Sequence, residues 1–168
     1  MDTALLILRL VLGLYMLAHG TQKLFGWFDG HGFAATRGLV GGMLGYRPAL
    51  LWTLAVSVAE FAGGVLLIIG LLSPIGAIAV AAAMLSATLV PHWSKGPFGS
   101  SGGYELPLTN LAVAVGVGLA GPGAYSLDQV LNIGVPVAGS AAIAVAALVM
   151  VLVGIISRRP SAEPGTAA

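Results

Sequence analysis

The chain alternates long apolar runs with short polar connections, a pattern typical of proteins that cross a membrane several times. The five apolar runs are Thr3–Phe25, Ala49–Leu72, Ile75–Val90, Tyr104–Ala120 and Ile133–Ile156. A spanning helix needs about 20 apolar residues. The third and fourth runs are shorter than this, so we expect them to borrow residues at their ends or to lie in thinned bilayer. The pattern predicts an all-α bundle of five membrane-spanning helices.

Proline and glycine mark the ends of these helices. Pro48 and Pro74 stand where a first-turn proline belongs, Pro91 ends the third run, and residues 121–123 (Gly-Pro-Gly) end the fourth.

The connection at residues 26–47 is not plainly disordered. Phe33, Arg37, Val40 and Leu44 have helical spacing and predict a short helix lying in the membrane interface. The tail at residues 158–168 is short and polar, and we expect it to be disordered and cytoplasmic.

Composition supports an integral membrane protein. Of the 168 residues 58% are hydrophobic and 8% are charged, whereas a soluble domain has about 25% charged residues. The net charge of +1 gives no indication of nucleic-acid binding. The absence of cysteine excludes thiolate metal sites and disulfide exchange, and no other pattern suggests a metal site.

The basic residues test the number of spans. With five spans, six of the seven fall on one side of the membrane and none on the other. The positive-inside rule predicts that the side with the six basic residues faces the cytoplasm. They are Lys23, Arg37, Arg47, Lys95, Arg158 and Arg159. The N-terminus is then outside and the C-terminus cytoplasmic.

Glu60 is the most informative residue, because it is the one charge in the second apolar run. A carboxylate at that depth costs about 2.5–3.5 kcal/mol on insertion unless it has a partner. At ~1.5 Å per residue, Arg9 lies roughly 21 Å from the Lys23 end of its helix and Glu60 roughly 18 Å from Pro48. We therefore expect Arg9 to pair with Glu60, either as a structural clasp or as a functional site.

A second polar layer is expected at the cytoplasmic mouth. His19 and Lys23 share a face of the first helix, and Arg9 lies only ~40° away from Lys23 around it, so this face connects the layers. The candidate residues for ligand binding or proton handling are Arg9, His19, Lys23, Glu60, His92, Tyr104, Glu105 and Asn110. Simpler interpretations stay open. The histidines bond carbonyls at helix ends, the lysines extend toward the lipid headgroups, and Glu105 interacts favourably with the dipole of the helix that it begins.

Several motifs together resemble a known family. The first helix ends in His19-Gly-x-x-Lys23-Leu-Phe-Gly, and the second carries Glu60-Phe-Ala-Gly-Gly followed by Gly70-Leu. The fourth opens with Gly-Tyr104-Glu and is followed by Gly-Pro-Gly-x-Tyr-Ser-Leu-Asp128. Over roughly Leu5–Leu131 the chain is similar to the DoxX family of small bacterial membrane proteins.

The resemblance implies a four-helix core within residues 1–131 in the bacterial cytoplasmic membrane. The fifth helix, at residues 132–157, is additional to this core. The family's recurring polar positions match His19, Lys23, Glu60, Tyr104 and Glu105. Its members are described as membrane subunits or partners of oxidoreductases, including thiosulfate:quinone oxidoreductase, and one type of member is associated with redox defence.

Two functional hypotheses of different class follow. In the first, the chain is a subunit of a redox system that binds a quinone near the polar layers, with protein partners at the cytoplasmic face. In the second, it is a non-catalytic scaffold or a small-solute carrier. A stand-alone enzyme is not expected, because the chain shows no nucleotide motif and no paired nucleophile and base. Gly116 and Ala120 give the fourth helix a small-residue face that permits pairing within one chain or in a homo-oligomer.

Overall fold

The computed structural model describes residues 1–159, and helices are the regular secondary structure of that part of the chain. The expected tail lies outside the described residues from residue 160 onward. The α-helices are α1 (Asp2–Phe25), α2 (Gly32–Gly38), α3 (Ala49–Ile69), α4 (Ser73–Ala87), α5 (Glu105–Ala120), α6 (Leu127–Leu131) and α7 (Val137–Ile156). The prediction of an all-α membrane bundle is confirmed.

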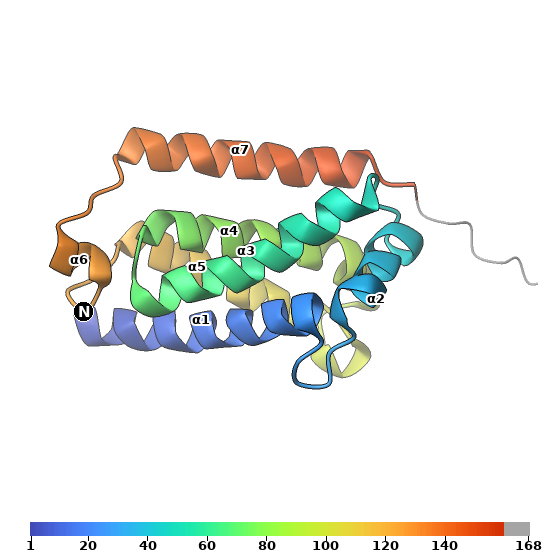
Figure 1. Ribbon diagram of the computed structural model, residues 1–168, viewed down its shortest axis with the longest axis horizontal. Coiled ribbons are helices and arrows are strands. Elements are labelled where there is room, and N and C mark those ends of the chain that lie inside the picture. Colours follow the sequence, from blue (N-terminus) through green and yellow to red (C-terminus); the bar gives the residue numbers. More distant parts are fainter. Residues whose placement is uncertain (160–168) are drawn as a thin grey trace, which may run out of the picture.

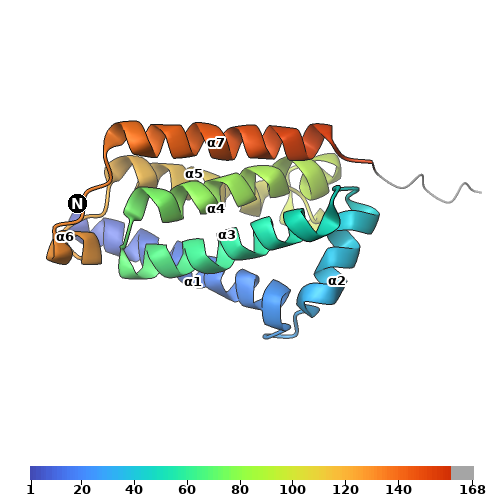
Figure 2. The same ribbon diagram turned by 45° about the horizontal axis from the view of Figure 1, so that its top comes forward.

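Four helical segments within residues 1–159 are long and apolar enough to cross a membrane. They are Asp2–Phe25, Ala49–Ile69, Ser73–Lys95 and Val137–Ile156. The 16-residue helix α5 is apolar but shorter, in line with the expectation for the fourth run. It lies alongside the longer helices in both views of the bundle (Figures 1 and 2).

The connecting segments gather at two opposite ends of the bundle (Figure 1). The N-terminus, the turn between α3 and α4, and α6 lie at one end, here termed the α6 end. The C-terminal ends of α1 and α7 lie at the other, together with α2 and the loop between α4 and α5, and this is termed the α2 end.

Helices α1 and α3 approach each other through glycines, which let two backbones come close. A Cβ placed on Gly20 would lie 2.5 Å from the backbone nitrogen of Phe61, and one on Gly13 would lie 2.9 Å from the carbonyl oxygen of Gly64. Gly64 in turn faces the backbone of Leu17. These contacts fix which residues of α1 and α3 share a level.

The apolar core lies among α1, α3, α4 and α5. Gly63 of α3 faces Gly76 and Val80 of α4, and Gly118 of α5 faces Ala77. The fully buried side chains of the core include Met16, Leu67, Val80, Ala114 and Val117. Each of the four helices therefore contributes at least one side chain to a single interior.

The third span is longer than its apolar run suggests. The apolar run ends at Pro91, and the helix continues as a π-helix (Thr88–His92) and a short 3-10 turn (Trp93–Lys95). Proline lacks the amide hydrogen that the α-helical ladder needs, and the wider π turn carries the chain past this missing donor. The span thus includes residues beyond its apolar run, as expected for so short a run, and ends at Lys95.

Helix α7 packs against α4 on the outside of the bundle (Figure 2). At the α2 end, Gly154 lies against the rings of Trp52 and Tyr46. Arg158 then donates from Nε to the Leu44 carbonyl at 2.7 Å. The fifth helix is thus attached most firmly where it meets the segment before α3.

Replacing Gly20 with alanine tests the close α1–α3 contact. The added methyl group would meet Phe61 backbone atoms, which cannot rotate away, so we expect destabilisation by about 1–3 kcal/mol. Thermal unfolding of the purified protein in detergent measures the change. Gly116→Ala is the matched control, because a Cβ there meets nothing within 4 Å; equal losses in both variants would contradict the contact.

Candidate functional site

Glu60 and Lys23 form an ion pair between α3 and α1. The Glu60 side chain is 4% exposed, whereas that of Lys23 is 27% exposed. Lys23 therefore reaches the carboxylate from a partly open position, with its aliphatic stem over the helix surface. In this pair a buried anion is neutralised by a cation that has access to the outside.

The sequence of α3 places Glu60 on the stripe that faces α1. Thr53, Ser57, Glu60, Gly64 and Leu67 alternate spacings of four and three and are all buried. Such spacing keeps side chains on one face of a helix. Lys23 lies in the last turn of α1, where a cation also interacts favourably with the helix dipole.

Arg9 does not pair with Glu60, so the expected clasp is wrong. The Arg9 side chain is 1% exposed and donates to backbone carbonyls at the α6 end. Its Nε bonds Leu67 at 3.0 Å and its Nη2 bonds Ile68 at 3.4 Å, while Nη1 bonds both Pro122 and Tyr125. The guanidinium fork thus closes the C-terminal end of α3 against the segment after α5.

The depth estimate failed because it took Pro48 and Lys23 to lie at one level. Phe61 lies opposite Gly20, so Val58 lies level with Lys23, an offset of about ten residues or ~15 Å. Helix α3 begins beyond the end of α1, where Ala49 packs against Gly41 of the π-helix (Leu39–Met43) that continues α2. Glu60 consequently lies level with the last turns of α1.

Asp128 is the carboxylate that balances Arg9. Its two oxygens accept from the amides of Leu72 and Ser73, each at 2.8 Å, and so cap the start of α4 from a distant part of the chain. Asp128 is 3% exposed and interacts electrostatically with Arg9. Gly70 lies between them with φ +65, and a Cβ there would be 2.2 Å from Arg9 Nη2.

The sequence contains a signal for this Arg9–Asp128 cluster that the expectations above do not include. The Gly-Pro-Gly-x-Tyr-Ser-Leu-Asp motif carries both the carbonyls of Pro122 and Tyr125 and the carboxylate of Asp128. Asp128 was treated only as part of a motif because it follows the apolar run. Its burial could be inferred only from the packing of α6 on the α3–α4 turn.

The two candidate histidines have different surroundings. His19 is partly buried, and its ring contacts Tyr15 edge-on with 4.5 Å between centroids. His92 Nδ1 lies 2.6 Å from the carbonyl oxygen of Gly102, so Nδ1 carries the proton and donates. The interpretation of His92 as a histidine that bonds a backbone carbonyl fits this geometry.

Tyr104, Glu105 and Asn110 belong to the start of α5 and are not brought to the Lys23–Glu60 pair by any described contact. Tyr104 stacks on Trp93 with 4.9 Å between ring centroids. Glu105 Oε1 accepts from the amide of Gly99 at 2.7 Å, which orders the glycine-rich loop. Asn110 is partly buried, and the structure shows no hydrogen bond of its side chain within residues 1–159.

Comparison with known proteins decides the family. The DoxX family model matches residues 4–93, which is more than half of the chain. The chain belongs to the DoxX family. No curated protein and no solved structure matches it. The match includes the Lys23–Glu60 pair and Arg9, whereas Tyr104, Glu105 and Asp128 lie beyond it.

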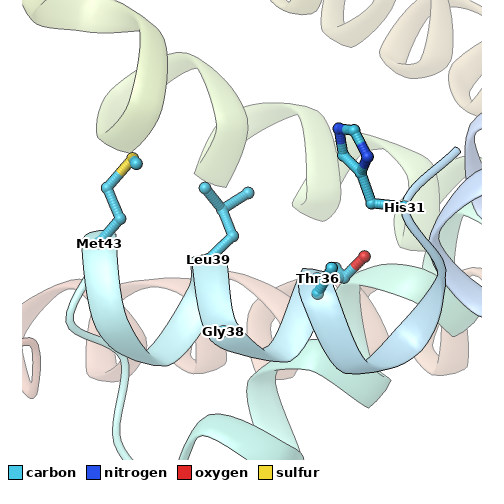
Figure 3. Close-up of a pocket in the computed structure, with 6 residues that line it drawn as sticks. His31, Thr36, Gly38, Leu39 and Met43 are labelled. Atoms are coloured by element: carbon cyan, nitrogen blue, oxygen red, sulfur yellow. The ribbon is translucent and has the colours of Figure 1, made fainter.

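Two open grooves mark the surface of this DoxX protein. One, of about 470 Å³, runs along α2 and the π-helix that continues it, where His31, Leu39 and Met43 point to the same side (Figure 3). The other, of about 430 Å³, is apolar and lies between α1 and α5, walled by Leu5, Leu8 and Val113 among others. Neither is lined by Glu60 or Lys23. Residues 1–159 hold no cluster of three metal-ligating acidic, histidine or cysteine side chains.

A double-mutant cycle distinguishes the observed ion pair from the expected one. For Lys23→Met and Glu60→Gln we expect a coupling energy of about 1 kcal/mol or more, because the groups are in contact. The losses of unfolding free energy caused by Arg9→Met and by Glu60→Gln should add within ~0.5 kcal/mol, because the two residues are far apart and share no partner. Unfolding in detergent measures both cycles. Strong coupling only between Arg9 and Glu60 would support the expected Arg9–Glu60 pair instead of the observed one.

Asp128→Asn tests the distant cap of α4. The amide offers one acceptor where the carboxylate offers two, and it leaves Arg9 without its counter-charge, so we expect a loss of about 1–3 kcal/mol in unfolding free energy. The exposed Asp29→Asn is the matched control. Similar stability for both variants would show that the cap contributes little.

Proposed function

We propose that this DoxX protein is a membrane subunit or partner of an oxidoreductase system, and that it binds a quinone-like amphiphile beside the Lys23–Glu60 pair. The observation that carries the proposal is a buried carboxylate held by a partly exposed lysine inside a membrane bundle. Charged residues in such bundles mark ligand or proton pathways by default. A simple clasp would not need one partner to remain accessible.

The distribution of apolar and polar side chains along α1 supports the binding of an amphiphilic ligand. Its first turns form a wall of the apolar groove through Leu5 and Leu8, and its last turns carry His19 and Lys23. A molecule lying along α1 would span ~22 Å between Leu8 and Lys23. Its apolar tail would occupy the groove, and its carbonyl head would accept hydrogen bonds from Lys23 or His19.

Quinone reduction to quinol takes two electrons and two protons. Glu60 and His19 are the groups of the site that exchange protons. The electrons come from a redox protein partner, which we place at the α2 end.

We further propose that the protein lies in the bacterial cytoplasmic membrane with its α2 end toward the cytoplasm. The basic residues of the connections support this orientation through the positive-inside rule. Exposed aromatic side chains, which favour the headgroup level, also gather in the segments at that end. They are Phe25, Trp27, Phe28, Trp93 and Phe98.

A scaffold or a small-solute carrier is the second candidate function. It is favoured by one observation, that the described grooves are not lined by Glu60 or Lys23. In that case the ion pair stabilises the bundle and the α2 end docks partners. A Lys23→Met and Glu60→Leu double variant would then fold and still copurify with those partners.

Quinone binding by the purified protein tests the first proposal. We expect a quinone in the organic extract of gently solubilised protein. Glu60→Gln should weaken its rebinding about tenfold or more, because Glu60 holds the Lys23 ammonium and a hydrogen bond from that charged group to the quinone carbonyl is worth ~1.5–3 kcal/mol. Asp29→Asn is the control, because this carboxylate is exposed and forms no ion pair with Lys23. Absence of binding by the folded wild type, or unchanged binding by Glu60→Gln, would contradict the proposal.

A further inference from the structure

Ser57 carries a buried hydroxyl group that has no hydrogen-bond partner within residues 1–159. It is 0% exposed, and its Oγ makes no hydrogen bond to the described residues. Other buried hydroxyl groups of the bundle bond the carbonyl one turn back: Thr53 donates to Ala49 at 2.7 Å, and Thr88 donates to Met84 at 2.8 Å. Ser57 could use the same bond within its own helix and does not.

The position of Ser57 singles out Glu60 as its neighbour. The two residues are three apart on the buried stripe of α3 that faces α1, and such pairs are neighbours on a helix, with about 5–6 Å between their Cβ atoms. Only Oε2 of Glu60 is engaged, by Lys23, while Oε1 takes part in no hydrogen bond with residues 1–159. An unused donor and an unused acceptor therefore lie one turn apart.

We propose that Ser57 Oγ is the second hydrogen-bond partner of Glu60, and that the two residues complete a proton-binding site which fills when Lys23 withdraws toward the surface. One proton from water at the α2 end joins the Glu60 carboxylate and makes a neutral carboxyl group. Lys23 keeps its own proton and its charge. Ser57 then bonds the carboxyl group in place of the departed ammonium.

The asymmetry of the ion pair supports this exchange. Lys23 is partly exposed and has a flexible stem, so it can leave the pair and be solvated. Glu60 is 4% exposed and cannot follow it. A buried carboxylate without a counter-ion is more costly than a protonated one, so proton uptake accompanies the opening.

The other charged groups around Glu60 do not replace Lys23. Helix α1 offers His19 one turn before Lys23, and α4 carries no titratable side chain between Ser73 and Ala87. His31 and Arg37, at and within α2, are both exposed. Apart from Glu60, α3 itself has no titratable group from Ala49 to Ile69.

The inference rests on the proposed function in one respect only: the proton bound at Glu60 would be used in quinone reduction. It is tested without quinone, by infrared titration of the folded protein in detergent. As the pH falls, a carboxyl C=O band should appear that Glu60→Gln removes. If Glu60→Gln folds poorly, labelling glutamate with ¹³C in a Glu105→Gln, Glu163→Gln double variant identifies the same band by its isotope shift, because Glu60 is then the one glutamate left in the sequence.

Ser57→Ala should move this band to a higher wavenumber, because the hydrogen bond to the carboxyl group is lost, and Ser57→Thr should restore its position. Ser73→Ala is the matched control, since Ser73 Oγ is also buried and unpartnered but lies at the α6 end. In the Lys23→Met variant the carboxyl band should be present already at neutral pH.

An unmoved band in Ser57→Ala would overturn the role of Ser57, and a missing band in Lys23→Met at neutral pH would overturn that of Lys23. A shifted band without quinone binding would reject the proposed function alone.

Discussion

The glycine contact between α1 and α3 determines the depth of every charged residue in the first two spans. Because Gly13 and Gly20 let the helices touch through their backbones, the register cannot slide without steric overlap. This register brings Glu60 to Lys23 and carries Arg9 to the far end of α3. The choice of ionic partners in this bundle therefore follows from packing, and attraction between charges acts only within the register that packing permits.

The two polar clusters created by this register have different chemical character. At the α6 end, Arg9 donates to four carbonyls and Asp128 accepts two amide hydrogens. Although Ser73 Oγ at this end has no hydrogen bond to the described residues, the many bonds of these two charged groups suit the cluster to holding helix ends in place. At the α2 end, within residues 1–159, Glu60 has one bonded oxygen, Ser57 Oγ has no hydrogen bond, and Lys23 is partly exposed. Unused hydrogen-bonding capacity in a protein interior is costly, and in the proposal above the proton bound at Glu60 uses it.

Much of the architecture could be predicted from hydropathy, because the apolar character that a spanning segment needs is visible in that segment's own sequence. The ends at Pro48 and Gly70 and the helix within residues 26–47 also follow from local chemistry. The partner of Glu60 could not be obtained in the same way. Counting residues from helix ends assumes that all helices end at one level, whereas α3 starts beyond α1. The site of Asp128 depends on contacts between residues more than 50 positions apart, which no local pattern contains.

The carbonyl cage of Arg9 has a consequence for how the chain is made. Arg9 is synthesised with α1, but Pro122, which bonds it, follows 113 residues later. Until then a guanidinium group in the translocon or in lipid lacks part of its final coordination, and this delay favours keeping α1 near a hydrated channel. Synthesis of the segment up to α6 is thus the step at which α1 becomes fully compatible with hydrocarbon. A chain that stops before Pro122 leaves Arg9 without two of its four carbonyl partners.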